Sequence, residues 1–153
     1  MKIVMPATEP VYIDTSVLVK WLLIEPYTDE VAAFFNQNDH LVLSELTLLE
    51  VHCALGRNER AGAINQVYRI HAERTLAQQL QNAWFELTPF LNATFKEAKL
   101  LIDSIAPLSL RSLDAMHLTI AKKAGIKRLA TADKEMLTAA QALNFNTEYF
   151  NNN

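Results

Sequence analysis

Short apolar runs alternate with helix-like segments along nearly the whole chain, and this alternation restricts the possible folds more than any other feature. Five runs are predicted strands: residues 10–14, 40–43, 84–87, 128–131 and 146–150. Apolar spacing and cap residues predict helices over 15–24, 29–38, after Ser44, over 92–104, from Ser109 or Ser112 to 124, and over 133–143. This order favours an α/β/α sandwich, rich in helix, with a mainly parallel central sheet.

One segment, residues 59–82, lies outside this alternation. It is polar and rich in Gln and Ala, with few apolar positions. Gly56, Arg57 and Asn58 just before it predict a break or bend in the preceding helix. We expect 59–82 to form a helical hairpin or arm at the surface that buries little of itself. Gly125 and Asn144 are expected to end two of the later helices.

The composition indicates one packed domain. The chain has 153 residues, half of them hydrophobic and only 3 of them glycine, which is enough for a single core. We predict one domain over residues 1–150 and a tail over 151–153. No apolar stretch reaches the ~20 residues of a membrane span, and residues 1–10 lack the pattern of a signal peptide. A cytoplasmic location, away from membranes, is the expectation.

Four acids occupy positions where their neighbours make a charge costly. Asp14 ends the first predicted strand, Asp133 follows the fourth, Glu50 interrupts an apolar helical stretch, and Asp114 lies in the first turn of a helix. A carboxylate beside buried apolar surface is unfavourable unless it is paired or binds a cation. Ligands of parallel sheets bind at the carboxyl ends of the strands. We therefore predict that the four acids share one pocket that holds a hard divalent metal.

The chain offers mainly oxygen ligands to a metal. Cys53 is the only cysteine, which excludes an internal disulfide and a Cys-based zinc site, and no His cluster competes. Carboxylates suit Mg²⁺ or Mn²⁺. The net charge of −3 includes the four predicted site acids, so it does not exclude a nucleic-acid partner. It does exclude a strongly basic coat protein.

Three of the acids also have ordinary structural explanations. The aspartates at the strand ends suit a turn and a helix N-cap, and the aspartate in the first helical turn suits the helix dipole. Glu50 is harder to explain in this way. It shares a helical face with Leu46, Leu49 and Cys53, which is predicted to be buried. Four such acids together favour a common site over four separate coincidences.

Four motifs, taken in order, resemble those of a known family. They are residues 12–20 (YIDTSVLVK), 44–51 (SELTLLEV), 110–118 (LRSLDAMHL) and 130–134 (ATADK). They look like the motifs of PIN domains, especially the VapC-type toxins, and they cover the chain nearly end to end. One departure is Asn144, which stands where many members have glycine. Each motif is short, and the ordered set carries the resemblance.

The resemblance implies a ribonuclease that depends on Mg²⁺ or Mn²⁺. Asp14, Asp114 and Asp133 are then expected to be direct or water-mediated ligands of the metal. Glu50 is expected to be a ligand or to orient the attacking water. Such metals activate water and stabilise the charge that develops on the phosphate and the leaving oxygen.

Residues next to the acids keep two interpretations each. Thr15 and Thr131 contact a carboxylate, a water or a phosphate, or else they only bond to backbone at a strand end. Arg111 holds a phosphate, since guanidinium pairs well with phosphate, or is a solvated loop residue. His117, one turn after Asp114, faces the site or is a packed helix residue.

Three other classes of protein compete with this interpretation. A receiver-like phosphotransfer domain needs an acidic pair after the first strand, and a haloacid-dehalogenase-type phosphatase needs Asp-x-Asp there. Asp14-Thr15-Ser16 supplies neither. A PIN-fold interaction module without nuclease activity is the third, and the intact acids argue against it.

The resemblance also implies partners: an RNA substrate, a second copy of the chain in a homodimer, and a small antitoxin. The early helices carry large apolar groups on more than one face, such as Val19, Trp21 and Phe34. Such helices need cover beyond their own core. We expect an amphipathic antitoxin helix to lie in a groove between these helices and the 59–82 segment, although contacts within the core or a homodimer would also cover them.

Overall fold

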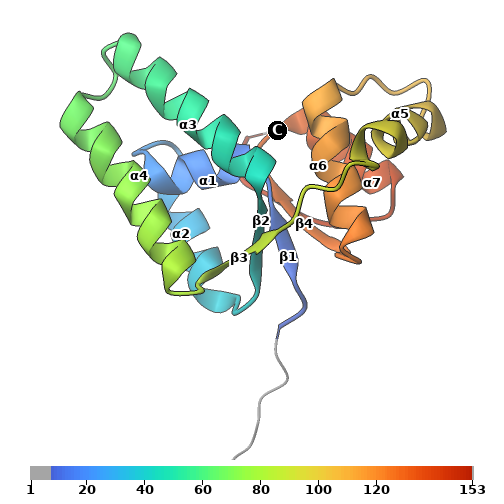
Figure 1. The fold of residues 1–153 in the computed structure, drawn as a ribbon, viewed down its shortest axis with the longest axis horizontal. Helices are drawn as coiled ribbons and strands as arrows, with labels where there is room; N and C mark the ends of the chain where they lie inside the picture. Colours follow the sequence, from blue (N-terminus) through green and yellow to red (C-terminus); the bar gives the residue numbers. More distant parts are fainter. Residues whose placement is uncertain (1–7, 153) are drawn as a thin grey trace, which may run out of the picture.

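The computed structural model describes residues 8–152, and these contain a five-stranded sheet in which every neighbouring pair of strands is parallel (Figure 1). The strands are β1 (Val11–Ile13), β2 (Leu41–Ser44), β3 (Phe85–Thr88), β4 (Arg128–Thr131) and β5 (Asn146–Tyr149). Their order is β3-β2-β1-β4-β5. The chain moves outward from β1 on one side and then returns to its other side. Strand order therefore reverses at β1, which makes its carboxyl end a topological switch point.

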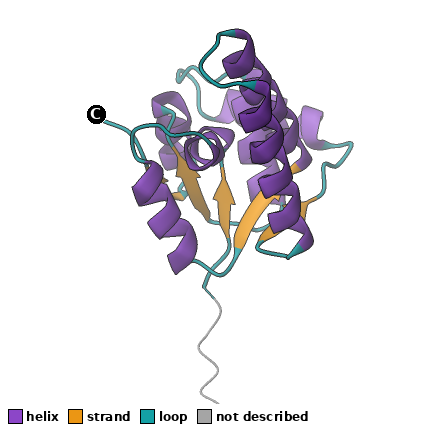
Figure 2. Cartoon of the chain, turned by 90° about the vertical axis from the view of Figure 1, so that its left-hand side faces the viewer, coloured by secondary structure: helices purple, strands orange, loops and turns teal. Residues whose placement is uncertain are grey.

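Helices cover both faces of the sheet. In the described chain they are α1 (Thr15–Leu22), α2 (Thr28–Gln37), α3 (Glu45–Arg60), α4 (Gln66–Gln81), α5 (Thr94–Ser104), α6 (Ser112–Lys123) and α7 (Lys134–Ala142). The first four lie on one side of the sheet and the last three on the other (Figures 1 and 2). The predicted α/β/α sandwich is confirmed. None of the helices within residues 8–152 combines the length and the apolar surface that crossing a membrane requires.

The sheet divides the interior into two apolar cores because alternate residues of a strand point to opposite faces. Val11 and Ile13 pack in the core beneath α1–α4, whereas Tyr12 packs in the core beneath α5–α7. All three side chains are fully buried, as expected for the central strand of a parallel sheet that is covered on both faces. The switch point is therefore held rigidly from both sides.

Residues 59–82 do not form a separate arm, and the predicted break near Gly56 is wrong. α3 continues through Gly56 to Arg60, and α4 then packs against α3 and β3. A glycine costs a helix about 1 kcal/mol, and the burial of Leu55 beside it offsets that cost. α4 buries Ala72 and Leu76 in the core. Its sparse apolar residues belong to the domain interior.

Helix starts agree with the prediction at Ser44 and differ at α6. The Ser44 hydroxyl accepts from the backbone N–H of Thr47 at 3.3 Å, so the expected N-cap of α3 is present. Neither Ser109 nor Ser112 caps α6. Arg111 holds the N-cap position and its side chain makes no cap bond. It points instead to acids of the pocket described below, and this use of the side chain explains why the cap rule fails here.

Two helices end in left-handed residues, as predicted. Gly125 has φ 71° after α6, and Asn144 has φ 63° after α7. Glycine has no Cβ to clash in this conformation, and asparagine is among the residues that tolerate it. The asparagine therefore serves the turn that leads from α7 into β5.

Candidate acidic site

All four predicted acids line one pocket of about 400 Å³ at the carboxyl edge of the sheet. Asp14 follows β1 and Asp133 follows β4, so both lie at the switch point. Glu50 comes from the second turn of α3, and Asp114 from the first turn of α6. The beginnings of these two helices flank the same edge of the sheet (Figure 1). The fold thus brings together residues from four separate parts of the sequence.

Asp14 lies deepest in the pocket and is held by neutral donors. Only 5% of its surface is exposed. Its Oδ2 accepts a hydrogen bond from the Ser16 hydroxyl at 2.6 Å and another from the Thr131 hydroxyl at 2.9 Å. Its backbone N–H donates to the carbonyl of Ala130 at 3.0 Å. Hydroxyl groups hold the carboxylate in place without neutralising it.

The same hydroxyls lock the ends of β1 and β4 together. Thr131 Oγ1 accepts from the backbone N–H of Asp133 at 3.0 Å, and Ser16 Oγ accepts from the N–H of Ala132 at 2.9 Å. Thr131 is fully buried. Each hydroxyl therefore bonds an acid on one side and backbone on the other, so the position of Asp14 relative to Asp133 is fixed by buried contacts.

Glu50 is held on the opposite wall by a buried histidine. His117 Nε2 lies 3.0 Å from Glu50 Oε1 and 3.3 Å from Oε2. The imidazole is fully buried, while the Glu50 side chain is 24% exposed. Burial acts to raise the pKa of Glu50, but the hydrogen bond to His117, with smaller contributions from the Thr15 hydroxyl and the Arg111 charge, outweighs it, so this pKa lies below its ordinary value. Glu50 therefore remains a carboxylate near neutral pH.

Asp114 and Asp133 share a single arginine. Arg111 Nε donates to Asp114 Oδ2 at 2.9 Å, and its Nη2 donates to Asp133 Oδ2 at 2.6 Å. Asp133 also caps α7, because its Oδ1 accepts from the backbone N–H groups of Glu135 and Met136. The Arg111 side chain is 63% exposed. It joins two acids of the pocket, and most of its side chain faces solvent.

Electrostatics agree with this division of the pocket. The hydrogen bond to Asp114 and the charges of Asp114 and Asp133 raise the pKa of Arg111 above its ordinary value. Burial raises the pKa of Asp114, and Arg111 opposes part of that increase. The charges of Asp14 and Asp133 add to the repulsion that Asp114 experiences. Acids that repel one another attract a cation, and here the cation is the protein's own guanidinium.

The donor set of the pocket fits a hard divalent cation. Carboxylate and hydroxyl oxygens line it, and such ligands suit Mg²⁺ or Mn²⁺ better than softer metals. With Arg111 in place, no three His, Cys, Asp or Glu side chains of residues 8–152 are grouped closely enough to hold one ion. The residues therefore fit the metal in chemistry, but a metal would have to replace the guanidinium between Asp114 and Asp133.

The sequence correctly predicted that the acids share a pocket, but its reasoning about Glu50 was wrong. Leu49 is 61% exposed and Cys53 is also exposed, so the helical face they share with Glu50 is not buried. The Glu50 side chain nevertheless lines the pocket, next to this exposed face of α3. Of the auxiliary residues, Thr131 does contact a carboxylate. The hydroxyl oxygen of Thr15, Oγ1, lies 3.4 Å from His117 Nε2.

Several residues of the pocket were missed by the sequence analysis. Ser16 bonds Asp14, and Arg57, Asn58 and Asn151 line the rim. The signal for Ser16 was its place two residues after the strand-end acid. Arg57 lies seven residues after Glu50, two helical turns along the same face of α3. Asn151, in the predicted tail, donates to the Ala132 carbonyl at 3.0 Å, and no local pattern indicates this.

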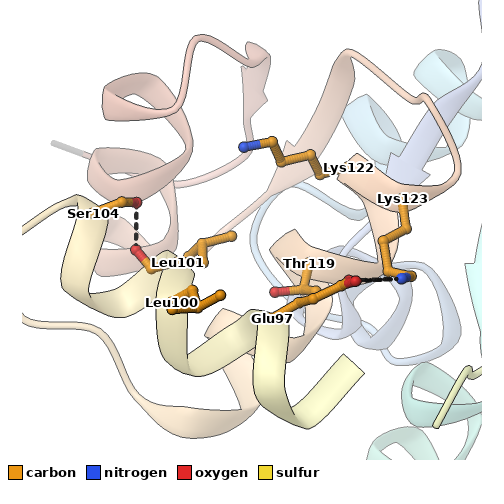
Figure 3. Close-up of a pocket in the computed structure, with 7 residues that line it drawn as sticks. All are labelled: Glu97, Leu100, Leu101, Ser104, Thr119, Lys122 and Lys123. Atoms are coloured by element: carbon orange, nitrogen blue, oxygen red, sulfur yellow. Dashed lines mark hydrogen bonds and ion pairs between the residues drawn. The ribbon is translucent and has the colours of Figure 1, made fainter. Parts of the chain in front are cut away.

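A second hollow of about 460 Å³ lies between α5 and α6 (Figure 3). Leu100 and Leu101 form part of its wall. Among the described residues that line it, the only ion pair joins Lys123 Nζ to Glu97 Oε2 at 2.7 Å. Its lining has one carboxylate, Glu97, whereas the pocket at the switch point has five: the four predicted acids and Glu25. Its chemistry therefore does not match the site predicted from the acids.

A parallel sheet with helices on both faces and an acidic pocket at its switch point places this chain among α/β domains that bind ligands at the carboxyl edge. The chain belongs to the PIN domain family, whose sequence model matches residues 11–142. The match spans all four acids. No curated protein matches the sequence.

Solved structures of similar fold include a toxin and a DNA-bound VapBC complex. One is VapC20 of Mycobacterium tuberculosis, a toxin that cleaves the sarcin–ricin loop, with TM-score 0.67 and 14% identity over 84% of this chain and 94% of that one. Another is FitAcB of Neisseria gonorrhoeae, with TM-score 0.61 and 20% identity over 92% and 96%. A third is DNA-bound VapBC of Salmonella typhimurium, with TM-score 0.66 and 13% identity over 94% and 99%. At these identities the similarity is one of fold.

Proposed function

We propose that this protein is a metal-dependent ribonuclease of the VapC toxin type, which hydrolyses RNA phosphodiester bonds with Mg²⁺ or Mn²⁺. The observation that carries the proposal is the meeting of Asp14, Glu50, Asp114 and Asp133 in one pocket of a PIN domain. Four carboxylates with partial burial and mutual repulsion have a clear use as cation ligands.

Within this proposal Asp14, Asp114 and Asp133 hold the cation, and Glu50 binds it or orients the attacking water. The bound metal supplies an activated water and stabilises charge on the scissile phosphate. Ser16 and Thr131 keep Asp14 in position through Oδ2. Glu50, whose pKa is lowered, is a carboxylate, and its two oxygens have acceptor capacity for a water beyond the bond to His117.

Two arginines at the pocket suit an RNA backbone. Arg57 lines the pocket, and no ion pair within residues 8–152 engages it. The Arg111 side chain is 63% exposed, so it could turn outward if Asp114 and Asp133 held a metal. Guanidinium groups bind phosphates through paired N–H donors. In this proposal Arg111 first neutralises the empty pocket and then contacts the substrate.

The same proposal includes an antitoxin and a homodimer. A hollow of about 330 Å³ lies between the end of α1 and the α3–α4 turn, lined by Leu23, Ile24, Ile64 and Tyr68 among others. Ile24 is 90% exposed. An amphipathic helix from a small partner would cover this apolar surface. Replacing Ile24 with Asp should weaken capture of the antitoxin, while Leu100→Asp on α5 serves as an exposed control elsewhere.

The nuclease proposal is tested with purified protein and a pool of labelled RNA oligonucleotides. Cleavage should require Mg²⁺ or Mn²⁺, stop with EDTA, and disappear in Asp114→Asn while the circular dichroism spectrum stays unchanged. Cleavage that survives EDTA, or that persists in Asp114→Asn, would rule out the proposed site. A folded wild type that binds metal and cleaves no RNA would favour a PIN-fold interaction module instead.

A further inference from the structure

Behind Glu50 lies a buried chain of polar side chains that extends from the pocket wall into the core beneath α5–α7. His117 Nδ1 lies 2.7 Å from the Tyr12 hydroxyl. The Tyr12 hydroxyl lies 2.8 Å from Ser44 Oγ, which in turn lies 3.2 Å from Thr47 Oγ1. Buried polar groups are costly unless they are satisfied. Every buried side-chain polar atom within the described residues has a partner.

The direction of these hydrogen bonds follows from what each group can donate. A carboxylate only accepts, so the ring nitrogen that faces Glu50 must carry a proton. That nitrogen is Nε2. A neutral imidazole with its proton on Nε2 has an acceptor at Nδ1, and the partner there is the Tyr12 hydroxyl. An ordinary phenol carries its proton near neutral pH, so Tyr12 can donate that proton to Nδ1 at 2.7 Å.

The remainder of the chain is consistent with this direction. Ser44 Oγ accepts from the backbone N–H of Thr47, which leaves the Ser44 hydroxyl proton free to point to the Tyr12 oxygen. The donors then run one way, from Ser44 to Tyr12 to His117 to Glu50. Hydrogen bonds in such a series polarise one another. The series ends at the Glu50 carboxylate on the pocket wall.

We propose that His117 is a positioning residue, fixed by Tyr12 in the tautomer protonated on Nε2, which holds the Glu50 carboxylate on the pocket wall for metal and water. The histidine acts through Glu50 and touches no substrate, since its side chain is fully buried and does not line the pocket. Its part in catalysis rests on the proposed ribonuclease function. Its role in placing Glu50 does not depend on that function.

Two substitutions separate the contributions of the two hydrogen bonds that the His117 ring makes, one to Glu50 and one to Tyr12. In His117→Gln the amide nitrogen lies near the position of Nε2, so it still donates to Glu50. In His117→Asn the side chain is too short to reach Glu50, but its amide oxygen still accepts from Tyr12. The pair therefore removes one bond at a time and keeps a polar group in the same cavity. Tyr12→Phe removes the hydroxyl that selects the tautomer.

The first measurement needs no activity. Nitrogen-15 spectra of the His117 ring in the metal-free wild type should show a protonated Nε2 and an unprotonated Nδ1, and Tyr12→Phe should give a mixture of tautomers. A proton on Nδ1 in the wild type, with or without one on Nε2, would overturn the assignment of Tyr12 as the donor. This result is independent of whether the protein cleaves RNA.

The second experiment measures Mn²⁺ affinity by electron paramagnetic resonance and, in parallel, the kinetics of RNA cleavage. His117→Asn should lose roughly 10- to 100-fold in Mn²⁺ affinity or kcat, the usual effect of removing the partner of a metal ligand, while KM for RNA stays near the wild-type value. His117→Gln should recover most of the loss. Equal behaviour of the two variants would overturn the proposal. If the wild type cleaves no RNA, the ribonuclease proposal fails and Mn²⁺ affinity of the two variants still decides the role of His117.

Discussion

The two halves of the acidic pocket are held by different chemistry. In the inner half, neutral side chains or a buried imidazole hold the acids: Ser16 and Thr131 bond Asp14, and His117 bonds Glu50. In the outer half, one exposed guanidinium holds Asp114 and Asp133. The inner half is fixed by groups that belong to the core, whereas the outer half is held by a side chain that can leave.

This difference separates placing a charge from neutralising it. Hydroxyl donors orient the Asp14 carboxylate but leave its negative charge available to a cation. Arg111 cancels much of the charge of the outer pair and lowers the repulsion in the pocket. An exposed ion pair contributes little to stability, so its loss on metal binding costs little. We expect substitutions in the inner half to affect the fold and the chemistry, and those in the outer half to affect mainly metal binding.

The largest expected effect is at the deepest acid. Asp14→Asn keeps the shape of the side chain and removes its charge, so RNA cleavage with Mg²⁺ should fall by more than about 100-fold, since the loss of mere outer-shell partners already costs 10- to 100-fold. The melting temperature in metal-free buffer should stay equal or rise, because one of several like charges has gone. Asp103 is an exposed residue of α5, so Asp103→Asn is the matched control and should change neither the cleavage rate nor the melting temperature. Cleavage by Asp14→Asn at the wild-type rate would remove the inner half from the chemistry.

The next effect concerns the hydroxyl that joins β4 to Asp14. Thr131→Val keeps the shape but leaves the buried Asp14 carboxylate and the Asp133 N–H with one partner fewer, so unfolding free energy should fall by about 2–3 kcal/mol. Thr131→Ser keeps the hydroxyl and should cost only about 1 kcal/mol for the lost methyl. Urea unfolding of both variants measures the difference. If serine and valine destabilise equally, the hydroxyl does not hold the inner half.

The folding of the scaffold is predictable because local signals determine most of it. Alternating apolar runs predict the strands, and Ser44 and Asp133 are recognisable caps. The convergence of the acids also follows, since strand ends at a parallel edge must meet. Some of the contacts that hold the acids do not follow from local patterns. The partners of Asp14 and Glu50 lie 117 and 67 residues away, and only the assembled sheet brings them together.

Exposure is the part that the sequence predicted least well. Cys53 and Leu49 look like core residues by their type, yet α3 projects beyond the sheet and leaves that face uncovered. The polar segment over 59–82 looks like an appendage, yet a few apolar residues of α4 suffice to close the core over α3. Whether a helical face is covered depends on the path of its neighbours, which periodicity alone does not contain.

A smaller effect tests the outer half directly. Arg111→Gln removes the guanidinium that competes with a metal, so unfolding free energy without metal should change by less than about 1 kcal/mol. The rise of melting temperature caused by Mg²⁺ should then be larger than in the wild type, because ligand stabilisation grows with affinity. Arg60→Gln, an exposed arginine at the far end of α3, should leave the rise unchanged. An equal or smaller rise in Arg111→Gln would contradict competition between arginine and metal.

The smallest effect is in the pH dependence of Asp114. Because burial raises its pKa in the folded state above the ordinary 3.8, its contribution to stability is present at low pH and is lost as the pH rises through that raised pKa. Without metal, the melting temperature of Asp114→Asn relative to wild type should therefore increase with pH, by a few degrees at most. A difference that decreases with pH would show that Arg111 lowers the Asp114 pKa more than burial raises it.

The pairing of β1 with β4 has a consequence for the order in which the protein is made. Asp14 is synthesised early, but its partner Thr131 follows 117 residues later, which takes about 6–23 s at ~5–20 residues per second. Until then β1 lacks one of its two neighbours, and Asp133, which follows β4, does not yet exist. A nascent chain therefore carries no complete acidic pocket until residue 133 has been synthesised, however early Asp14 itself is made.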